Sequence, residues 1–173
     1  MINHCIDLLT FEEIYRQHID LVYNMALHYV RNVEEAEEIT QDVFVKVYFN
    51  LSKYRFEADL KTWIYRITIN ASLDSIRKSK RGRSIFISWS EDEVSEKSLI
   101  SDFKNPLSEL VNQEALNGLL NKIDQLPNNQ KSVVLLMKME FLTQKEVAKI
   151  LEISEKAVES LFQRAKENLK KMI

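Results

Sequence analysis

The chain has 173 residues, enough for one ordinary domain or two small ones. Only two glycines and two prolines occur, which favours helices throughout. A formal net charge of −2 argues against nucleic-acid binding by bulk positive charge alone. The single cysteine excludes a disulfide framework and fits a reducing cytoplasm. No run approaches about 20 apolar residues, and the first ten residues lack the pattern of a signal peptide, so we expect no membrane insertion.

The charged residues are segregated by sign. Residues 34–42 and 91–96 are rich in acidic side chains, whereas 77–83 and 164–171 are rich in basic ones. Such segregation suits a protein that touches a partner protein and a nucleic acid at different places.

Helical spacing of apolar residues begins near the N-terminus. Residues 10–30 predict one helix, with Thr10 and Glu13 spaced as a capping box. Asn32 is placed to cap a second helix, with Glu35 at the third position. The acidic residues in the first turns of this second helix favour the positive end of its dipole.

The middle of the chain changes character. Residues 52–59 predict a loop, and a third helix starts at Leu60 and ends in the basic stretch near Arg77. Residues 79–105 are rich in serine and mixed charge with only short apolar pairs, which predicts a mobile linker. Helical structure should resume at Pro106, because proline is favoured in the first turn of a helix.

The last part of the chain predicts a helix-turn-helix. Pro127 begins a helix, after which Thr143 and Glu146 have the spacing of a capping box. Ser154 can cap the next helix, whose Val158 and neighbouring apolar residues face inward. Four residues of this helix should face outward: Glu155, Lys156, Glu159 and Ser160. A helix of this kind is the element that enters a DNA major groove.

Three further runs narrow the class of regulator. Residues 37–48, with the sequence EEITQDVFVKVY, resemble the most recognisable stretch of bacterial sigma factors, and residues 54–67 and 70–78 resemble the next segments of those proteins. Together with the helix-turn-helix, they make the chain similar to the extracytoplasmic-function (ECF) group of the sigma-70 family. The resemblance covers residues 10–78 and 106–172.

This resemblance implies an all-α protein of two small domains joined by a flexible linker. Residues 1–78 would correspond to sigma domain two, 79–105 to the linker, and 106–173 to sigma domain four. The family's function is to bind core RNA polymerase, recognise the minus-thirty-five and minus-ten promoter elements and assist DNA melting. The residues that would face the polymerase are Glu38, Gln41, Asp42, Val45 and Lys46.

The resemblance also assigns residues to promoter DNA. Those implied for the minus-ten element, with 53–62 as the loop that captures a flipped base, are Tyr54, Arg55, Phe56, Lys61, Thr62, Trp63, Arg66, Asn70, Asp74, Arg77 and Lys78. Those implied for the minus-thirty-five element are Ser154, Glu155, Lys156, Glu159, Ser160 and Arg164. Aromatic and guanidinium faces can stack on an extruded base, which supports this use of the loop independently. Trp63 lies on the apolar stripe of the third helix, which favours a role as a core anchor over a DNA contact. For Tyr54 and Phe56, anchoring of the loop and contact with a base are equally open.

The sequence departs from the family at two places. The turn of the helix-turn-helix usually carries glycine where this chain has Glu152, so we expect a left-handed residue that costs about 1 kcal/mol or more. After Pro127 the family often has arginine where this chain has Gln130 or Lys131. This second departure predicts a weaker phosphate or backbone contact.

No pattern indicates chemistry of the chain's own. Ser, His and Asp are not spaced as a nucleophilic site, and no glycine-rich loop cradles phosphate, so we expect no catalytic residue, no cofactor and no small-molecule substrate. His4, Cys5, His18 and His28 match no compact metal-ligand set, so no metal is expected. By resemblance, the partners are core polymerase, promoter DNA and an anti-sigma factor, which can hold this cytoplasmic bacterial protein at the membrane.

The sequence leaves two other functions open. One is a stand-alone helix-turn-helix regulator that binds an operator. The other is a sequestering protein with a degenerate DNA reader. A sigma factor binds core polymerase, an operator binder footprints without it, and a sequestering protein never supports initiation.

Overall fold

The computed structural model describes residues 2–54, 59–87 and 109–172, with side chains for 11–52, 54, 59–79 and 116–172. Its described elements are helical, with no strand among them. The chain divides into two compact units, residues 1–100 and 101–173, as expected of a two-domain all-α protein. Each unit is described by itself.

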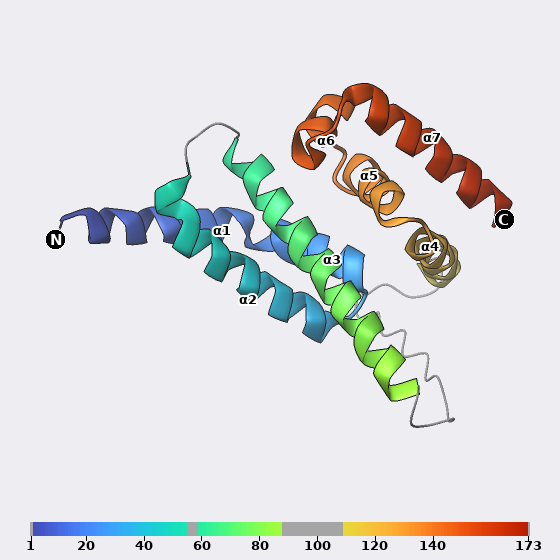
Figure 1. Ribbon diagram of the computed structural model, residues 1–173, viewed down its shortest axis with the longest axis horizontal. Coiled ribbons are helices and arrows are strands. Elements are labelled where there is room, and N and C mark those ends of the chain that lie inside the picture. The colour runs from blue at the N-terminus through green and yellow to red at the C-terminus, as the bar shows by residue number, and fades with distance from the viewer. Residues whose placement is uncertain (1, 55–58, 88–108, 173) are drawn as a thin grey trace. The chain divides into compact units, whose positions relative to one another are not determined.

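The first unit consists of three long helices that contact one another (Figure 1). They are α1 (Ile2–Val30), α2 (Val33–Asn50) and α3 (Leu60–Ile87), with a short 3₁₀ turn at Leu51–Lys53. Each helix contributes one apolar face, because its buried residues recur every three or four positions. The buried set includes Val22, Met25, Ala26 and Tyr29 of α1, Ala36, Ile39, Val43 and Val47 of α2, and Ile64 and Tyr65 of α3.

Two helix boundaries differ from the sequence predictions. The first helix begins at Ile2, so Thr10 lies inside it and the predicted capping box at Thr10 is wrong. The third helix continues past Arg77 to Ile87, into the stretch expected to be linker. Basic residues are good helix formers and carry no signal that stops a helix, so composition alone misplaced this end. The predicted cap of α2 is confirmed, since the Glu35 amide donates to Asn32 Oδ1 at 2.8 Å.

The second unit contains α4 (Glu109–Asp124), α5 (Asn128–Lys138), α6 (Gln144–Leu151) and α7 (Glu155–Lys171) (Figure 1). Helix α5 is central: it contacts the other three, and its residues from Gln130 to Leu136 are all buried. Apolar residues from the surrounding helices cover it, including Leu120, Ile123, Val147, Ile150, Val158 and Ala165. The helix predicted after Pro127 is thus confirmed, with Pro127 immediately before its first residue.

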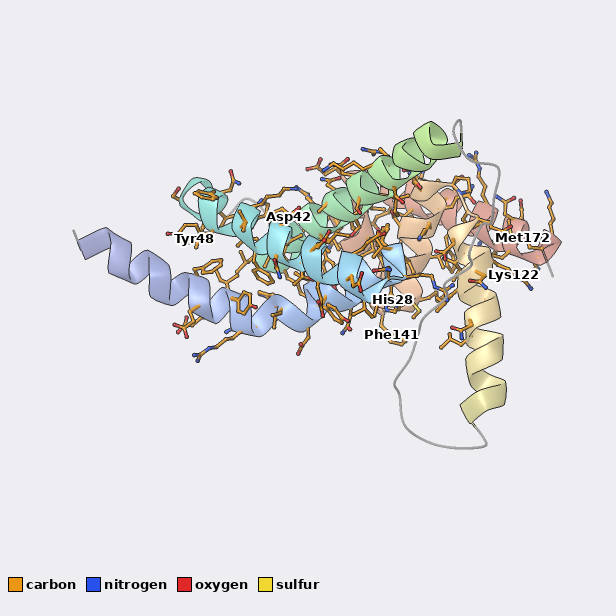
Figure 2. The ribbon with its side chains drawn as sticks, turned by 90° about the horizontal axis from the view of Figure 1, so that it is seen from below. His28, Asp42, Tyr48, Lys122, Phe141 and Met172 are labelled. Atoms are coloured by element: carbon orange, nitrogen blue, oxygen red, sulfur yellow. The ribbon has the colours of Figure 1, made fainter. Side chains whose placement is uncertain are left out.

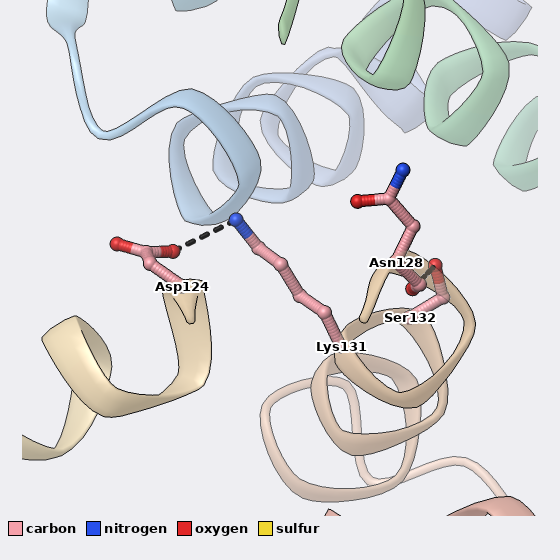
Figure 3. A network of polar contacts seen from close by, with 4 residues as sticks. All are labelled: Asp124, Asn128, Lys131 and Ser132. Carbon is pink, nitrogen blue, oxygen red and sulfur yellow. Dashed lines mark hydrogen bonds and ion pairs between the residues drawn. The ribbon is translucent and has the colours of Figure 1, made fainter. Parts of the chain in front are cut away.

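Buried polar side chains at the start of α5 all have partners. Lys131 Nζ lies 2.7 Å from Asp124 Oδ1 at the end of α4, and Ser132 Oγ donates to the Asn128 carbonyl (Figure 3). Gln130 Oε1 accepts from Asn168 Nδ2 of α7 at 2.9 Å. Lys131 is only 5% exposed and Gln130 only 8% exposed. Both side chains therefore join helices within the unit. The weaker phosphate or backbone contact predicted at this position stays a prediction.

Among the described residues, three adopt left-handed backbone conformations, and none of them is glycine. Arg31, Phe141 and Glu152 have φ of 55°, 54° and 56° and follow α1, α5 and α6, respectively. The left-handed conformation predicted for Glu152 is confirmed. A side chain there brings Cβ close to a carbonyl oxygen, which costs about 1–2 kcal/mol relative to a helical residue. In each case the conformation lets the chain reverse after a helix.

Replacing Glu152 with glycine should stabilise the second unit by about 0.5–1 kcal/mol, because relief of strain exceeds the added freedom of the unfolded chain. Glu152→Asn should lie between glutamate and glycine, since asparagine tolerates this region. Glu159→Gly, inside α7, should instead destabilise the second unit by about 1 kcal/mol, because glycine is unfavourable in the interior of a helix. Amide hydrogen exchange in α6 and α7 measures both effects, and lower protection in the Glu152→Gly protein would refute the strain argument.

Candidate protein and nucleic-acid interfaces

One face of α2 is fully exposed. All five residues assigned to polymerase binding, from Glu38 to Lys46, are exposed, while Ala36, Ile39, Val43 and Val47 on the other side are buried. Asp42 marks this face in Figure 2. Helical periodicity therefore brings the five side chains to one surface that mixes acidic, amide, apolar and basic groups.

An aromatic cluster extends this face and was missed from the sequence. Phe49 is 69% exposed, and its ring lies 5.4 Å from that of Tyr48, which in turn lies 5.2 Å from Phe11 of α1 (Figure 2). Asp42, Val45 and Phe49 are spaced three and four residues apart, as residues on one face of a helix are. This spacing could have identified Phe49 as exposed from the sequence. Val45 itself is 53% exposed. We refer to Val45, Tyr48 and Phe49 as the apolar extension of the α2 face.

The residues assigned to the minus-ten element line the start and one side of α3. Asn70, Asp74 and Arg77 are exposed and recur every three or four residues, whereas Trp63 and Arg66 on the same side are half-buried. Lys61 and Lys78 are also exposed, and Thr62 is half-buried. Arg55 and Phe56 lie outside the described residues. Most of the assigned residues of α3 thus share one side of the helix, although not all are fully accessible.

Tyr54 and Trp63 form the boundary of the loop. Their ring centroids lie 5.1 Å apart with an interplanar angle of 31°. Trp63 also contacts the core of the unit, as the core-anchor interpretation expects. Burial, followed by the negative charge of Asp59, raises the pKa of Tyr54, so this side chain is a neutral phenol at physiological pH. The two rings therefore hold the end of the loop against α3.

Two exposed charges of α3, those of Asp74 and Arg77, form an ion pair. Arg77 Nη1 lies 2.6 Å from Asp74 Oδ1, and both side chains are more than half exposed. A pair of this kind contributes about 0–1 kcal/mol at most, so it can open without destabilising the helix. Arg77 is consequently available to exchange a carboxylate for a phosphate.

His18 of α1 is influenced electrostatically by charged residues at the start of α3. Burial, and secondly the Lys61 ammonium, lower its pKa below the usual 6.5, while Asp59 acts in the opposite direction. The two charged residues come immediately after the loop. The ionisation of His18 is therefore coupled to the start of α3.

The helix-turn-helix has the predicted caps. The Glu146 amide donates to Thr143 Oγ1, and the Thr143 amide donates to Glu146 Oε2 at 2.8 Å, which completes the capping box. Ser154 Oγ accepts from the Ala157 amide at 3.2 Å. All six residues assigned to the minus-thirty-five element are exposed: Ser154, Glu155, Lys156, Glu159, Ser160 and Arg164. Of these, Lys156 and Ser160 lie opposite the buried Val158 and Ala165, and the others lie toward the sides of the helix.

One contact between the two helices was not predicted. The Gln144 amide Nε2 donates to the backbone carbonyl of Glu155 at 2.6 Å. Gln144 is the first residue of α6 and Glu155 is the first of α7. Nothing in the spacing of the sequence distinguishes this glutamine from an ordinary polar residue in a first turn.

No metal centre or membrane span is found in the described part of the chain. Its His, Cys, Asp and Glu residues form no group of three that could hold a metal ion. None of the helices within 2–54, 59–87 and 109–172 combines the length and apolar character that crossing a bilayer requires. The side chains of His4 and Cys5 lie outside those described.

Comparisons with known proteins agree with both units. Residues 14–82 match the model of sigma-70 region 2, and residues 116–169 match that of sigma-70 region 4. The ECF RNA polymerase sigma factors SigW and SigM of Bacillus subtilis are 28% and 26% identical to the chain. Each alignment covers 94% of this chain, together with 88% of SigW and 94% of SigM.

Solved structures share the fold. Sigma factor RpoE from Bartonella quintana, in complex with the anti-sigma factor NepR, aligns over 94% of this chain and 95% of its own with a TM-score of 0.69 and 17% identity. CnrH, in complex with the cytosolic domain of CnrY, has a TM-score of 0.66 and 19% identity, covering 94% and 86% of the two chains.

Two helical units, the second a helix-turn-helix, are typical of a DNA-associated regulatory protein. The matched regions make the assignment specific: the chain belongs to the ECF group of the sigma-70 family. It is thus a promoter-specificity subunit of RNA polymerase.

The stability of the first unit should fall as pH drops through 6.5. Above that pH His18 is neutral in both states; below it the unfolded chain takes up the proton more readily, because the folded pKa is lowered. His18→Gln should remove this part of the pH dependence, and Lys61→Met should reduce it only in part, because burial is the larger cause.

Urea unfolding between pH 5 and 7.5 measures this effect, with Trp63 fluorescence as the reporter in a Trp89→Phe background. Parallel pH profiles for the parent and His18→Gln proteins would contradict it.

Proposed function

We propose that the exposed face of α2 binds core RNA polymerase. The observation that carries this proposal is the continuous outward surface from Glu38 through Asp42 to Val45, opposite a buried face that is apolar except for Thr40. Gln41 and Lys46 lie on the same surface. A mixed surface with an apolar centre is what a specific protein interface requires, because burial supplies affinity and charge fixes the register.

The exposed side of α3 is proposed to bind the minus-ten element. Asn70 and Arg77 offer an amide and a guanidinium to the displaced strand, and the rings of Tyr54 and Trp63 offer stacking surfaces beside the loop. Support comes from the placement of Lys61, Arg66 and the basic end of the helix, which can follow a phosphate backbone.

Helix α7 is proposed to read the minus-thirty-five element. Its first turns expose Lys156, Glu159 and Ser160, which can contact base edges, and Arg164 lies further along the same side. Because Glu155 and Glu159 are acidic, the first turns of α7 offer little non-specific attraction to the duplex, and the basic residues lie further along the helix. Recognition by this unit should therefore depend on the polymerase to hold it over the DNA.

An anti-sigma factor is the proposed regulator. The solved relatives RpoE and CnrH are each in complex with a second protein, NepR and the cytosolic domain of CnrY, respectively. The chain would act in the cytoplasm, where core polymerase and the chromosome are, and an anti-sigma factor could hold it at the membrane.

Transcription reconstituted with core polymerase on a library of random promoters tests the proposal. The holoenzyme should select templates that share two elements with fixed spacing, and the protein without core should give no stable footprint. A footprint without core would instead favour an operator-binding regulator. Core binding without initiation on any template would favour a sequestering protein.

Charge reversal on the α2 face should weaken polymerase binding. Asp42→Lys should lower affinity for core about tenfold or more, because an exposed interface charge is replaced by one of opposite sign. Asp20→Lys is the matched control, because Asp20 carries the same side chain and is exposed, but belongs to α1 and not to the α2 face. Competition binding to fluorescent core polymerase, with helicity checked by circular dichroism, measures the effect. Equal affinity for the two variants would remove this face from the interface.

A further inference from the structure

The bond between Gln144 and Glu155 joins the first residues of the two helices of the DNA reader. The side-chain amide of Gln144 donates to the Glu155 carbonyl at 2.6 Å, across 11 positions of sequence. The side chain of Gln144 is half-buried and Glu155 is exposed. We infer that Gln144 is a positioning residue that fixes the direction of α7 relative to α6, and thereby which bases the side chains of α7 reach. The inference rests on the proposed role of α7.

The bond is placed where it constrains direction most. Helix α6 has eight residues and is about 12 Å long, so Gln144 lies at the end remote from the turn. Its contact with the first residue of α7 gives the two helices a second connection, in addition to the turn. An apolar contact tolerates sliding and rotation, whereas a hydrogen bond is directional. The buried contacts of Val147 and Val158 hold the helices together, and the Gln144 bond sets their angle.

The turn itself cannot set this angle alone. It consists of Glu152, Ile153 and Ser154, and its first residue is in a strained left-handed conformation. The amides of Glu152 and Ile153 both donate to the Ala148 carbonyl, so the end of α6 is held locally, but neither bond reaches α7. The Gln144 bond adds a restraint that does reach α7, at its first residue.

Gln144 is not needed to form either helix. Thr143 and Glu146 provide a complete capping box for α6, and Ser154 caps α7. Losing the Gln144 amide therefore leaves the caps and the apolar core intact. Positioning can for this reason be separated from folding.

A small change of angle is sufficient to alter recognition. A tilt of about 10° about Glu155 would move the Cα of Arg164, about 13 Å along the helix, by about 2 Å. Hydrogen bonds to base edges tolerate only a few tenths of an ångström. The first turns of α7, with Lys156 and Glu159, would move less, so the loss of discrimination should be greatest for contacts made furthest from Glu155.

The test replaces Gln144 with methionine, which keeps the length of the side chain and its neutrality but has no donor. Gln125→Met is the matched control, since Gln125 is exposed between α4 and α5, away from the residues assigned to DNA. Residual dipolar couplings of the full-length protein report the angle between α6 and α7 without reference to DNA. The angle should change or broaden in Gln144→Met only, while amide exchange protection in both helices stays at the parent level.

The functional arm uses holoenzyme on promoters randomised in the minus-thirty-five element. Discrimination between preferred and average sequences should fall on the order of tenfold at one or two positions for Gln144→Met, and not for Gln125→Met. Gln144→Lys, which restores a donor, should recover the parent sequence profile at a salt concentration that screens its added charge.

An unchanged angle and sequence profile in Gln144→Met would overturn the inference. Loss of discrimination together with loss of exchange protection would also overturn it, because the role would then be structural. If the parent holoenzyme fails to initiate, the proposed function fails, and the dipolar couplings alone decide whether Gln144 sets the angle.

Discussion

Burial of α5 on every side is the constraint on which the second unit depends. From Gln130 to Leu136 no residue of this helix faces solvent, so α4, α6 and α7 must all cover it. Its polar residues can be buried only because each has a partner, as the ion pair of Lys131 with Asp124 illustrates. Residues 130–136, which hold the unit together, are therefore unavailable for binding, and the proposed contacts with DNA involve exposed residues of the helix-turn-helix.

The first unit obeys a different rule. Each of its three helices buries a single face, so three outer faces remain for contacts. The exposed side of α2 and the exposed side of α3 belong to different helices, and either can change without disturbing the other's apolar face. A protein that must touch a polymerase and a separated DNA strand at the same time gains from this separation.

Much of this organisation could be predicted from sequence because it depends on local rules. The caps at Asn32, Thr143 and Ser154 result from side-chain chemistry over three residues, and the left-handed Glu152 results from the geometry of a tight turn. Helix ends without such signals were misplaced, as at Ile87, where the basic run continues the helix. Assignment of site residues depended on the family resemblance, while their exposure could be predicted from helical periodicity.

Contacts between elements could not be predicted in this way. The bond of Gln144 to a backbone carbonyl and the burial of Lys131 both depend on how helices cross, which no local spacing encodes. The apolar extension of the α2 face was missed for a different reason. Tyr48 and Phe49 are of residue types that are usually buried in a core. Their exposure is evident only from their position on the outward side of the helix.

The three left-handed residues also bear on how long a molecule of this protein persists in a cell. Arg31, Phe141 and Glu152 each place a side chain in a backbone conformation that glycine would adopt without strain, within three residues of the end of a helix. Joints of this kind open at lower energy than the helices they connect, and transient opening is what proteases act upon. Substitution at these joints would lengthen or shorten the lifetime of the protein while leaving the exposed faces of α2, α3 and α7 as they are. The amount of a regulator and the identity of its targets can thus be adjusted at separate positions of one chain.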